Sequence, residues 1–148
     1  MKVSTKGRYG LRAMIDLAAH QGNGKPVFLS DIAKRQDISE KYLEHIFSAL
    51  RTTGLIVTVR GRKGGFLLNK PASEITASDI VIALEGPSVL VDCVTKPKTC
   101  DKSDSCATRD IWSLLGNKID EVLSGFTLEQ LVTMQENKTQ KNDAMYYI

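Results

Sequence analysis

Three cysteines, Cys93, Cys100 and Cys106, are the residues of this chain whose types and spacing best fit a chemical role. They are the only cysteines among 148 residues, and all three lie in one polar stretch, DCVTKPKTCDKSDSCATRD. Buried structural cysteines usually stand on apolar elements. Thiolates on a polar loop can instead converge on a metal ion or a metal cluster. The stretch is therefore a candidate metal-binding segment.

The number and spacing of the cysteines leave other chemistry open. An odd count argues against a closed set of disulfides. Structural zinc usually takes four ligands, with gaps of about two to four residues between paired cysteines. The gaps here are six and five residues long, so zinc is a weaker alternative. A thiol redox switch is also open, because nearby lysines favour the thiolate form; they are Lys96, Lys98 and Lys102.

Charge is distributed unevenly along the chain. Residues 1–70 contain thirteen Lys and Arg against five Asp and Glu, and residues 71–148 contain seven against twelve. The halves therefore carry +8 and −5, which together give the net charge of +3. A basic half joined to an acidic half predicts a polyanionic partner for the first half. Nucleic acid is the expected partner, and an acidic protein is the alternative.

Several classes of protein are not expected. The chain has no run of about 18 apolar residues that would cross a membrane. Its first residues, MKVSTKGRYG, lack the apolar core of a secretory signal, so a cytoplasmic location is expected. No Ser/His/Asp set or phosphate loop is present, and GRKGG is too short and too basic for a dinucleotide fingerprint. An enzyme is therefore not expected.

The elements of the first half predict a winged helix-turn-helix. A helix is expected over residues 4–21, followed by two short helices that begin at the candidate N-caps Ser30 and Ser39. Asp37-Ile38 would form the turn between these two helices. The alternating segment IVTVR and the short FLL then predict two strands. The basic, glycine-rich GRKGG between them is typical of a wing.

The second half is expected to be helical apart from the cysteines. A capping box of Thr76 and Asp79 predicts a helix over residues 77–84. A longer helix over residues 108–123 has a wide apolar face that includes Trp112, which favours a dimer seam over packing on the head. The prediction is thus a mainly α protein with four parts: a DNA-binding domain (1–86), a cysteine-rich loop (87–107), a dimerisation helix with a short last helix (108–134) and a polar, mobile tail (135–148).

The expected DNA-binding residues come from three places. Lys41 on the second helix of the pair can donate to guanine, and Glu44 can accept from a cytosine amino group. Basic wing residues suit phosphate or minor-groove contacts, and glycines allow close backbone approach. The full candidate set is Lys6, Arg8, Ser39, Lys41, Tyr42, Glu44, His45, Arg51, Arg60, Arg62, Lys63, Gly64 and Gly65.

Four segments resemble one known family. They are STKGRYGLRAM, ISEKYLEHIFSALRTTGLI, VRGRKGGFLL and ITASDIVIALEGP, and they are similar to the Rrf2 family of winged-helix transcription regulators. The resemblance implies a homodimer, held by the long helix, that binds a roughly palindromic site on double-stranded DNA. The three cysteines followed by Thr108, Arg109 and Asp110 resemble the IscR branch, whose members bind an iron–sulfur cluster. That branch implies a repressor of cluster-assembly genes.

Carried over to this sequence, the resemblance makes Cys93, Cys100 and Cys106 the three cluster thiolates. It implies a [2Fe–2S] cluster, with [4Fe–4S] as the alternative. The first interval is one residue longer than in the IscR pattern. Arg109 stands where enteric relatives have a ligand histidine, and Arg8 stands where some NsrR-type relatives have an acidic ligand. The fourth ligand is therefore open among Asp101, Asp104, Asp110, a residue of the partner subunit and water.

A second branch offers an alternative function. CymR-type members, which regulate cysteine metabolism, resemble the chain in the head and in its Tyr146-Tyr147-Ile148 end. They lack the three-cysteine loop. A CymR-like regulator, or a thiol-sensing regulator without a cluster, is therefore the alternative to a cluster sensor.

Overall fold

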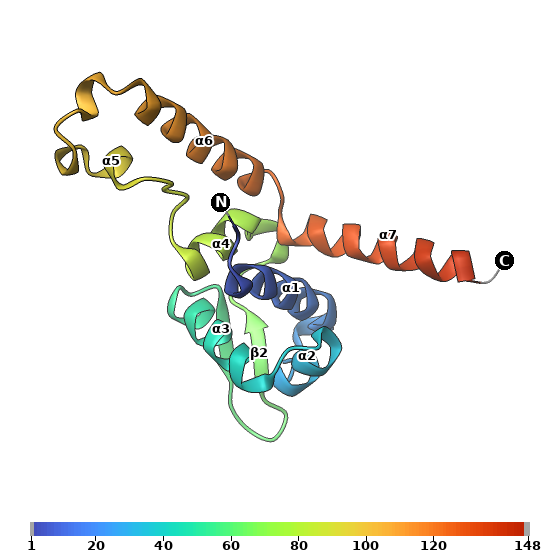
Figure 1. Cartoon of the computed structure of the whole chain (residues 1–148). Coiled ribbons are helices and arrows are strands. Elements are labelled where there is room, and N and C mark those ends of the chain that lie inside the picture. Colours follow the sequence, from blue (N-terminus) through green and yellow to red (C-terminus); the bar gives the residue numbers. More distant parts are fainter. Residues whose placement is uncertain (1, 147–148) are drawn as a thin grey trace.

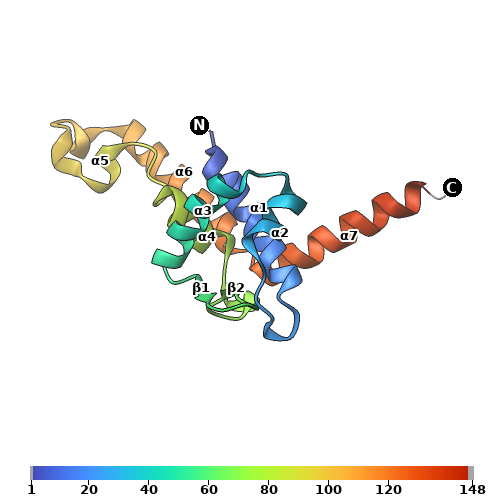
Figure 2. The same ribbon diagram turned by 90° about the horizontal axis from the view of Figure 1, so that it is seen from below.

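A helical head carries two helices that leave it in different directions. The computed structural model describes residues 2–146. Figure 1 shows the head at the centre, with α1–α4 around a small sheet. The chain leaves the head after α4, runs out to the cysteines and returns along α6, and α7 then extends to the other side. Figure 2 shows the same separation from below.

The helix-turn-helix is built from α1 (Thr5–His20), α2 (Leu29–Gln36) and α3 (Glu40–Thr52). The predicted cap of α3 is confirmed, because the Ser39 hydroxyl accepts a hydrogen bond from the Tyr42 amide at 3.3 Å. The turn is made by Asp37, whose φ of 53° ends α2 in the left-handed region. The predicted cap of α2 is wrong: Ser30 lies inside the helix, and the N-cap is Phe28, with no side-chain bond.

The wing is the antiparallel pair β1 (Ile56–Val59) and β2 (Gly65–Leu68). Val27, in the link before α2, pairs with Phe66 through two backbone hydrogen bonds of 3.0 and 2.8 Å. The link thus adds a third short extended segment to the sheet. Gly65 makes this possible, because its φ is 140° and a Cβ there would lie 2.5 Å from the Val27 carbonyl oxygen.

One core joins all parts of the head, and its buried apolar residues come from α1–α4, the wing and the start of α7. Phe47 of α3 meets Phe66 of β2 edge to face, with ring centres 4.9 Å apart. The helix α4 (Ala77–Glu85) has the predicted capping box of Thr76 and Asp79. Leu128 is fully buried, and its amide donates to the Ile75 carbonyl at 2.7 Å, so the start of α7 is anchored in the head.

The last two helices are α6 (Ala107–Ser124) and α7 (Leu128–Tyr146). A capping box of Thr127 and Gln130 begins α7. The expectation of a short last helix and a polar tail from residue 135 is wrong, because α7 continues to Tyr146. That stretch is polar but contains neither Gly nor Pro, and Gln, Glu and Lys are good helix formers. Tyr147 and Ile148 of the chain end lie outside the described residues.

We predict that Gly65→Ala destabilises the protein more than Gly61→Ala does. Both glycines have positive φ, 140° and 110°, but only at Gly65 would a Cβ meet backbone; Gly61 faces open space. The clash of the new Cβ at residue 65 with the Val27 backbone is expected to lower the free energy of unfolding by about 1–3 kcal/mol. Urea denaturation of the two variants measures the difference. Equal losses would show that the Val27 contact does not constrain position 65.

Candidate nucleic-acid interface and cysteine segment

The outward face of α3 carries most of the predicted base-reading residues. Its inward face is buried in the core through Leu43, Ile46, Phe47 and Leu50. Helical periodicity then leaves the other side free, and the exposed candidates there are Lys41, Glu44, His45 and Arg51. Two predicted contacts have other tasks in this structure. Ser39 caps the helix, and Tyr42 is half-buried.

Tyr9 links α1 to this face and was missed by the sequence reasoning. Its ring lies edge-on to Tyr42, with centres 6.2 Å apart. The guanidinium carbons of Arg8 and Arg12 lie 5.8 and 5.6 Å from the centre of the same ring. Such cation–π contacts hold long side chains in place. The run RYGLR, with an aromatic between two arginines, is the sequence signal that could have indicated this arrangement.

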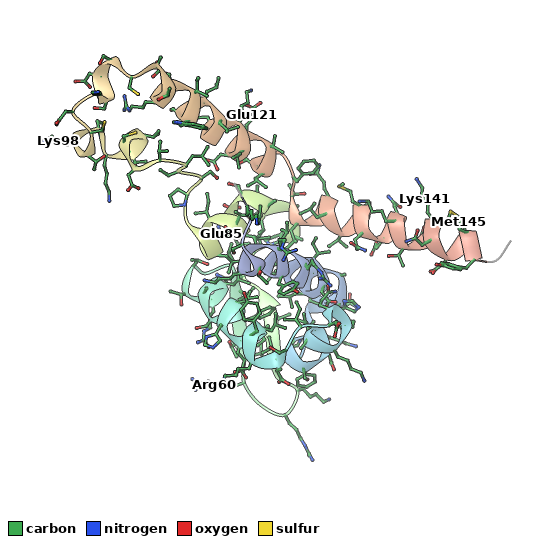
Figure 3. All side chains as sticks on the ribbon, viewed as in Figure 1. Arg60, Glu85, Lys98, Glu121, Lys141 and Met145 are labelled. Atoms are coloured by element: carbon green, nitrogen blue, oxygen red, sulfur yellow. The ribbon has the colours of Figure 1, made fainter. Side chains whose placement is uncertain are left out.

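The wing presents basic side chains on a turn beside α3. Arg60, Arg62 and Lys63 are exposed, and Figure 3 shows Arg60 at the wing. Gly64 is buried, and its amide donates to the Gly61 carbonyl at 3.0 Å. The lack of a side chain at Gly64 and Gly65 is therefore required by the turn and by the Val27 contact. Their approach to DNA remains a prediction.

A buried carboxylate fixes α2 against α1. The side chain of Asp16 is 2% exposed and accepts three hydrogen bonds of 2.6–3.1 Å from the Arg35 guanidinium and one of 2.8 Å from Gln36. Hydrogen bonding to Asp16 raises the pKa of Arg35 above its usual value. Arg12 donates to the Gln36 backbone carbonyl at 2.9 Å. The sequence reasoning missed this network; a lone aspartate within the apolar MIDLA was its signal.

The cysteine segment, residues 87–107, is folded into short helical turns. They are α5 (Asp92–Thr95) and two 3₁₀ helices, Pro97–Thr99 and Ser103–Ser105. Cys100 is exposed, Cys93 and Cys106 are half-buried, and all three are free thiols. Within residues 2–146, no three His, Cys, Asp or Glu side chains stand close enough together to hold a metal ion. The structure therefore shows the three predicted ligands on one segment but not converged.

The first part of the segment is tied to α6 at two points. The Arg109 Nε donates to the Cys93 carbonyl oxygen at 2.9 Å, and the Ser88 hydroxyl donates to Asp120 at 2.6 Å. Gly116 allows the segment to approach α6 closely, because a Cβ at residue 116 would lie 2.6 Å from the Ser88 carbonyl oxygen. The segment thus runs beside α6 in the opposite direction (Figure 1). Figure 3 shows its Lys98 at the end of the molecule remote from the wing.

Cys106 is the thiol whose surroundings most favour ionisation. It is the N-cap of α6, and its Sγ lies 3.1 Å from the Thr108 hydroxyl oxygen. This hydrogen bond, helped by the Arg109 backbone amide, lowers the pKa of Cys106 below its usual value. A thiolate is both the metal ligand and the reactive form of cysteine. Cys106 therefore suits either metal binding or redox chemistry.

The apolar face predicted for α6 is largely uncovered. Only Gly116 of this helix is buried, while Ile111, Trp112, Leu114 and Val122 are 59%, 39%, 61% and 59% exposed. Exposed Phe126 and Met134 continue the apolar surface into a cleft of about 450 Å³ where α7 begins. Exposed apolar patches of this kind mark interaction surfaces. The alternative that α6 packs fully onto its own head is not what the structure shows.

A helix-turn-helix followed by a basic two-stranded wing defines the winged-helix class of DNA-binding proteins. Within that class, the chain belongs to the Rrf2 family. The family profile, described as "Iron-dependent Transcriptional regulator", matches residues 3–134. The protein is therefore a DNA-binding transcription regulator and not an enzyme, as the sequence predicts. None of the helices described between residues 2 and 146 is long and apolar enough to cross a membrane.

Similar proteins carry two names. The HTH-type transcriptional regulator IscR of Photorhabdus laumondii is 43% identical over 136 residues, which is 92% of this chain and 82% of that protein. The solved structure of T. potens IscR is 39% identical with a TM-score of 0.75, covering 93% of this chain and 90% of its own. CymR, the global cysteine regulator of B. subtilis, is also 39% identical with a TM-score of 0.75, covering 90% and 98%. The oxidized form of Staphylococcus aureus CymR is 39% identical with a TM-score of 0.70, covering 89% and 96%.

We predict that Asp16→Asn lowers the free energy of unfolding by about 2–3 kcal/mol. Breaking a buried ion pair typically costs about 3–5 kcal/mol, and the 34% exposure of Arg35 lets water recover part of that loss. The control is Glu121→Gln, which removes the exposed pair with Lys118 and is expected to change little. Urea denaturation of both variants measures the effect. A similar, small loss in the two variants would show that Asp16 does not stabilise the head.

Proposed function

We propose that the protein is a cytoplasmic, homodimeric regulator whose affinity for DNA responds to an iron–sulfur cluster held by Cys93, Cys100 and Cys106. The observation that carries the proposal is the link between the cysteines and α6. The segment with the three free thiols is hydrogen-bonded to this helix, whose apolar face is uncovered. The IscR names of its relatives and the iron-dependence in the family description support it. Repression of cluster-assembly genes is the proposed role.

The donor types fit such a cluster, although the thiols stand apart in this structure. Iron–sulfur clusters are usually held by four cysteine thiolates, and other side chains can replace some of them. Arg109 is not a ligand, since it is cationic and bonded to the Cys93 carbonyl. The exposed candidates for the fourth position are Asp101, Asp104 and Asp110, beside a residue of the partner subunit or water. A [2Fe–2S] cluster is proposed, with [4Fe–4S] as the alternative.

The proposed regulation passes through α6. When bound, the cluster would supply sensitivity to cluster supply and to oxidative or nitrosative stress. Ligation of the three thiols would fix the segment that Arg109 and Asp120 join to α6. Because α6 would lie at the dimer seam, a shift of this helix changes how the two heads are spaced. The coupling between two such sites is typically about 1–3 kcal/mol.

The proposed DNA complex places α3 in the major groove and the wing beside it. Lys41 and Glu44 are proposed to read base edges, because both are exposed on the outward face of α3. Lys6 and Arg8 of α1 and the basic residues of the wing are proposed to contact phosphates. Two heads related by a twofold axis would then bind a roughly palindromic operator. The remaining proposed contacts are Ser39, Tyr42, His45, Arg51, Gly64 and Gly65.

A thiol switch without a cluster is the second candidate function. It is favoured by the lowered pKa of Cys106 and by three free, accessible thiols with no converged metal site among the described residues. The similarity to CymR, of which an oxidized form has been solved, supports the same candidate. In this case oxidation would pair two of the three thiols.

We predict that Lys41→Ala and Arg62→Ala weaken DNA binding in different ways. Loss of a base contact is expected to cost about 1–3 kcal/mol on the operator and to relax specificity at one position. Loss of a phosphate contact is expected to weaken binding to all sequences and to reduce the salt slope by about one. Lys118→Ala, on α6, is the matched control. Fluorescence anisotropy measures the DNA affinity of all three variants as a function of salt concentration. An equal loss of affinity in the control would reject the proposed interface.

We predict matched iron and acid-labile sulfide, with visible absorption, in protein purified without oxygen. Cys93→Ala, Cys100→Ala and Cys106→Ala are each expected to abolish both, while Ser105→Ala on the same segment keeps them. The spectrum then distinguishes two-iron from four-iron clusters. Colourless wild-type protein, even after reconstitution, would reject the cluster. A DNA affinity that then depends on oxidant and on two of the cysteines would establish the thiol switch.

A further inference from the structure

A small cleft lies between α1, the last residue of α2 and α7. Its volume is about 260 Å³, below the usual range for drug-sized ligands, so it suits a small metabolite. The residues that matter for recognition are Arg12, Ile15, His20, Gln36, Val132 and Glu136. Neither the cysteine segment nor the outward face of α3 contributes to the cleft. A ligand here would therefore act separately from both proposed sites.

The buried acid in the cleft wall offers no net charge to a ligand. Asp16 contributes to the cleft, but its carboxylate is bound by the guanidinium of Arg35 and by the Gln36 amide. His20 donates its Nδ1 proton to the Asp16 backbone carbonyl at 2.8 Å, since a carbonyl oxygen can only accept. The Nε2 of His20 is thereby left for a ligand. This part of the cleft is polar but close to electrically neutral.

Two uncompensated charges of opposite sign stand on different walls. Arg12 donates to two oxygens of Gln36, at 2.9 and 3.2 Å, and both of these acceptors are neutral. None of the ion pairs among residues 2–146 includes Arg12 or Glu136. The two side chains therefore make no ion pair with each other in this structure. The space between them is flanked by the apolar Ile15 and Val132.

We propose that this cleft binds a free α-amino acid. The carboxylate of the ligand would pair with Arg12 and its ammonium with Glu136, while Ile15 and Val132 contact the side chain. Charge-assisted hydrogen bonds of this kind are the strong ones. A purely anionic ligand would face the Glu136 carboxylate, and a purely cationic ligand would face the Arg12 guanidinium. Only a zwitterion can form a favourable charge pair with both Arg12 and Glu136.

Occupancy of the cleft would act on the helix-turn-helix. Gln36 is the last residue of α2, and the turn at Asp37 that positions α3 follows directly. Glu136 belongs to α7, which is anchored in the core through Leu128. A bound amino acid would bridge these two elements. The cleft thus provides a second input to DNA affinity, beyond the proposed cluster.

Isothermal titration calorimetry of the full-length protein with each of the twenty proteinogenic L-amino acids tests the proposal. At least one is expected to bind saturably with one site per chain. Its deaminated acid and its decarboxylated amine each keep one of the two charges. Both are expected to bind at least about tenfold more weakly than the amino acid. Saturable binding by none of the amino acids, or equal binding by a single-charge analogue, would overturn the proposal.

Matched variants locate the site. Glu136→Gln removes the proposed ammonium partner and is expected to weaken binding about tenfold, whereas Glu129→Gln, on α7 outside the cleft, leaves it unchanged. Both residues are exposed, so an unchanged thermal midpoint is expected to show intact folding. Unweakened binding by Glu136→Gln would overturn the site. The measurement uses neither DNA nor a cluster, so its failure leaves the proposed function standing.

Discussion

The orientation of α3 on the head depends on one buried carboxylate. Asp16 accepts hydrogen bonds from Arg35 and Gln36 at the end of α2, and Arg12 donates to the Gln36 backbone carbonyl. An ion pair in a protein interior is stabilising only when its hydrogen bonds are complete, and those of Asp16 are. Because α2 is fixed against α1 at this point, the turn at Asp37 and therefore α3 have a defined position on the head. The Tyr9–Tyr42 contact also joins α1 directly to α3.

Local patterns predicted most of the head, and non-local contacts account for what they missed. The Ser39 cap, apolar periodicity and the GRKGG turn were sufficient for α1, α3 and the wing. The role of Asp16 depends on residues 19 and 20 positions away, which no local pattern contains. The length of α7 was underestimated because polarity was read as a sign of a tail, although helix propensity does not require apolar residues. The three cysteines were predicted as ligands from residue type, but their separation in space depends on the turns between them.

The basic surface and the cysteine segment lie in different parts of the molecule. The basic surface belongs to the head, whereas Cys106 is the N-cap of α6 and Lys98 of the same segment lies at the end of the molecule remote from the wing. The ionisation of Cys106 is governed by local groups such as Thr108. Under the proposed regulation, communication between the two parts passes through α6 and depends on what covers its apolar face.

The bond from Arg109 ends on the main chain of residue 93 and not on its thiol. A backbone carbonyl is present whatever side chain occupies the position, so the docking of the segment onto α6 does not depend on the cysteine itself. Ser88 likewise meets Gly116 through its carbonyl. In evolutionary terms, the fold of this segment can be inherited while its thiols are lost or moved. The scaffold of the proposed sensor would then be retained when one sensing chemistry is exchanged for another.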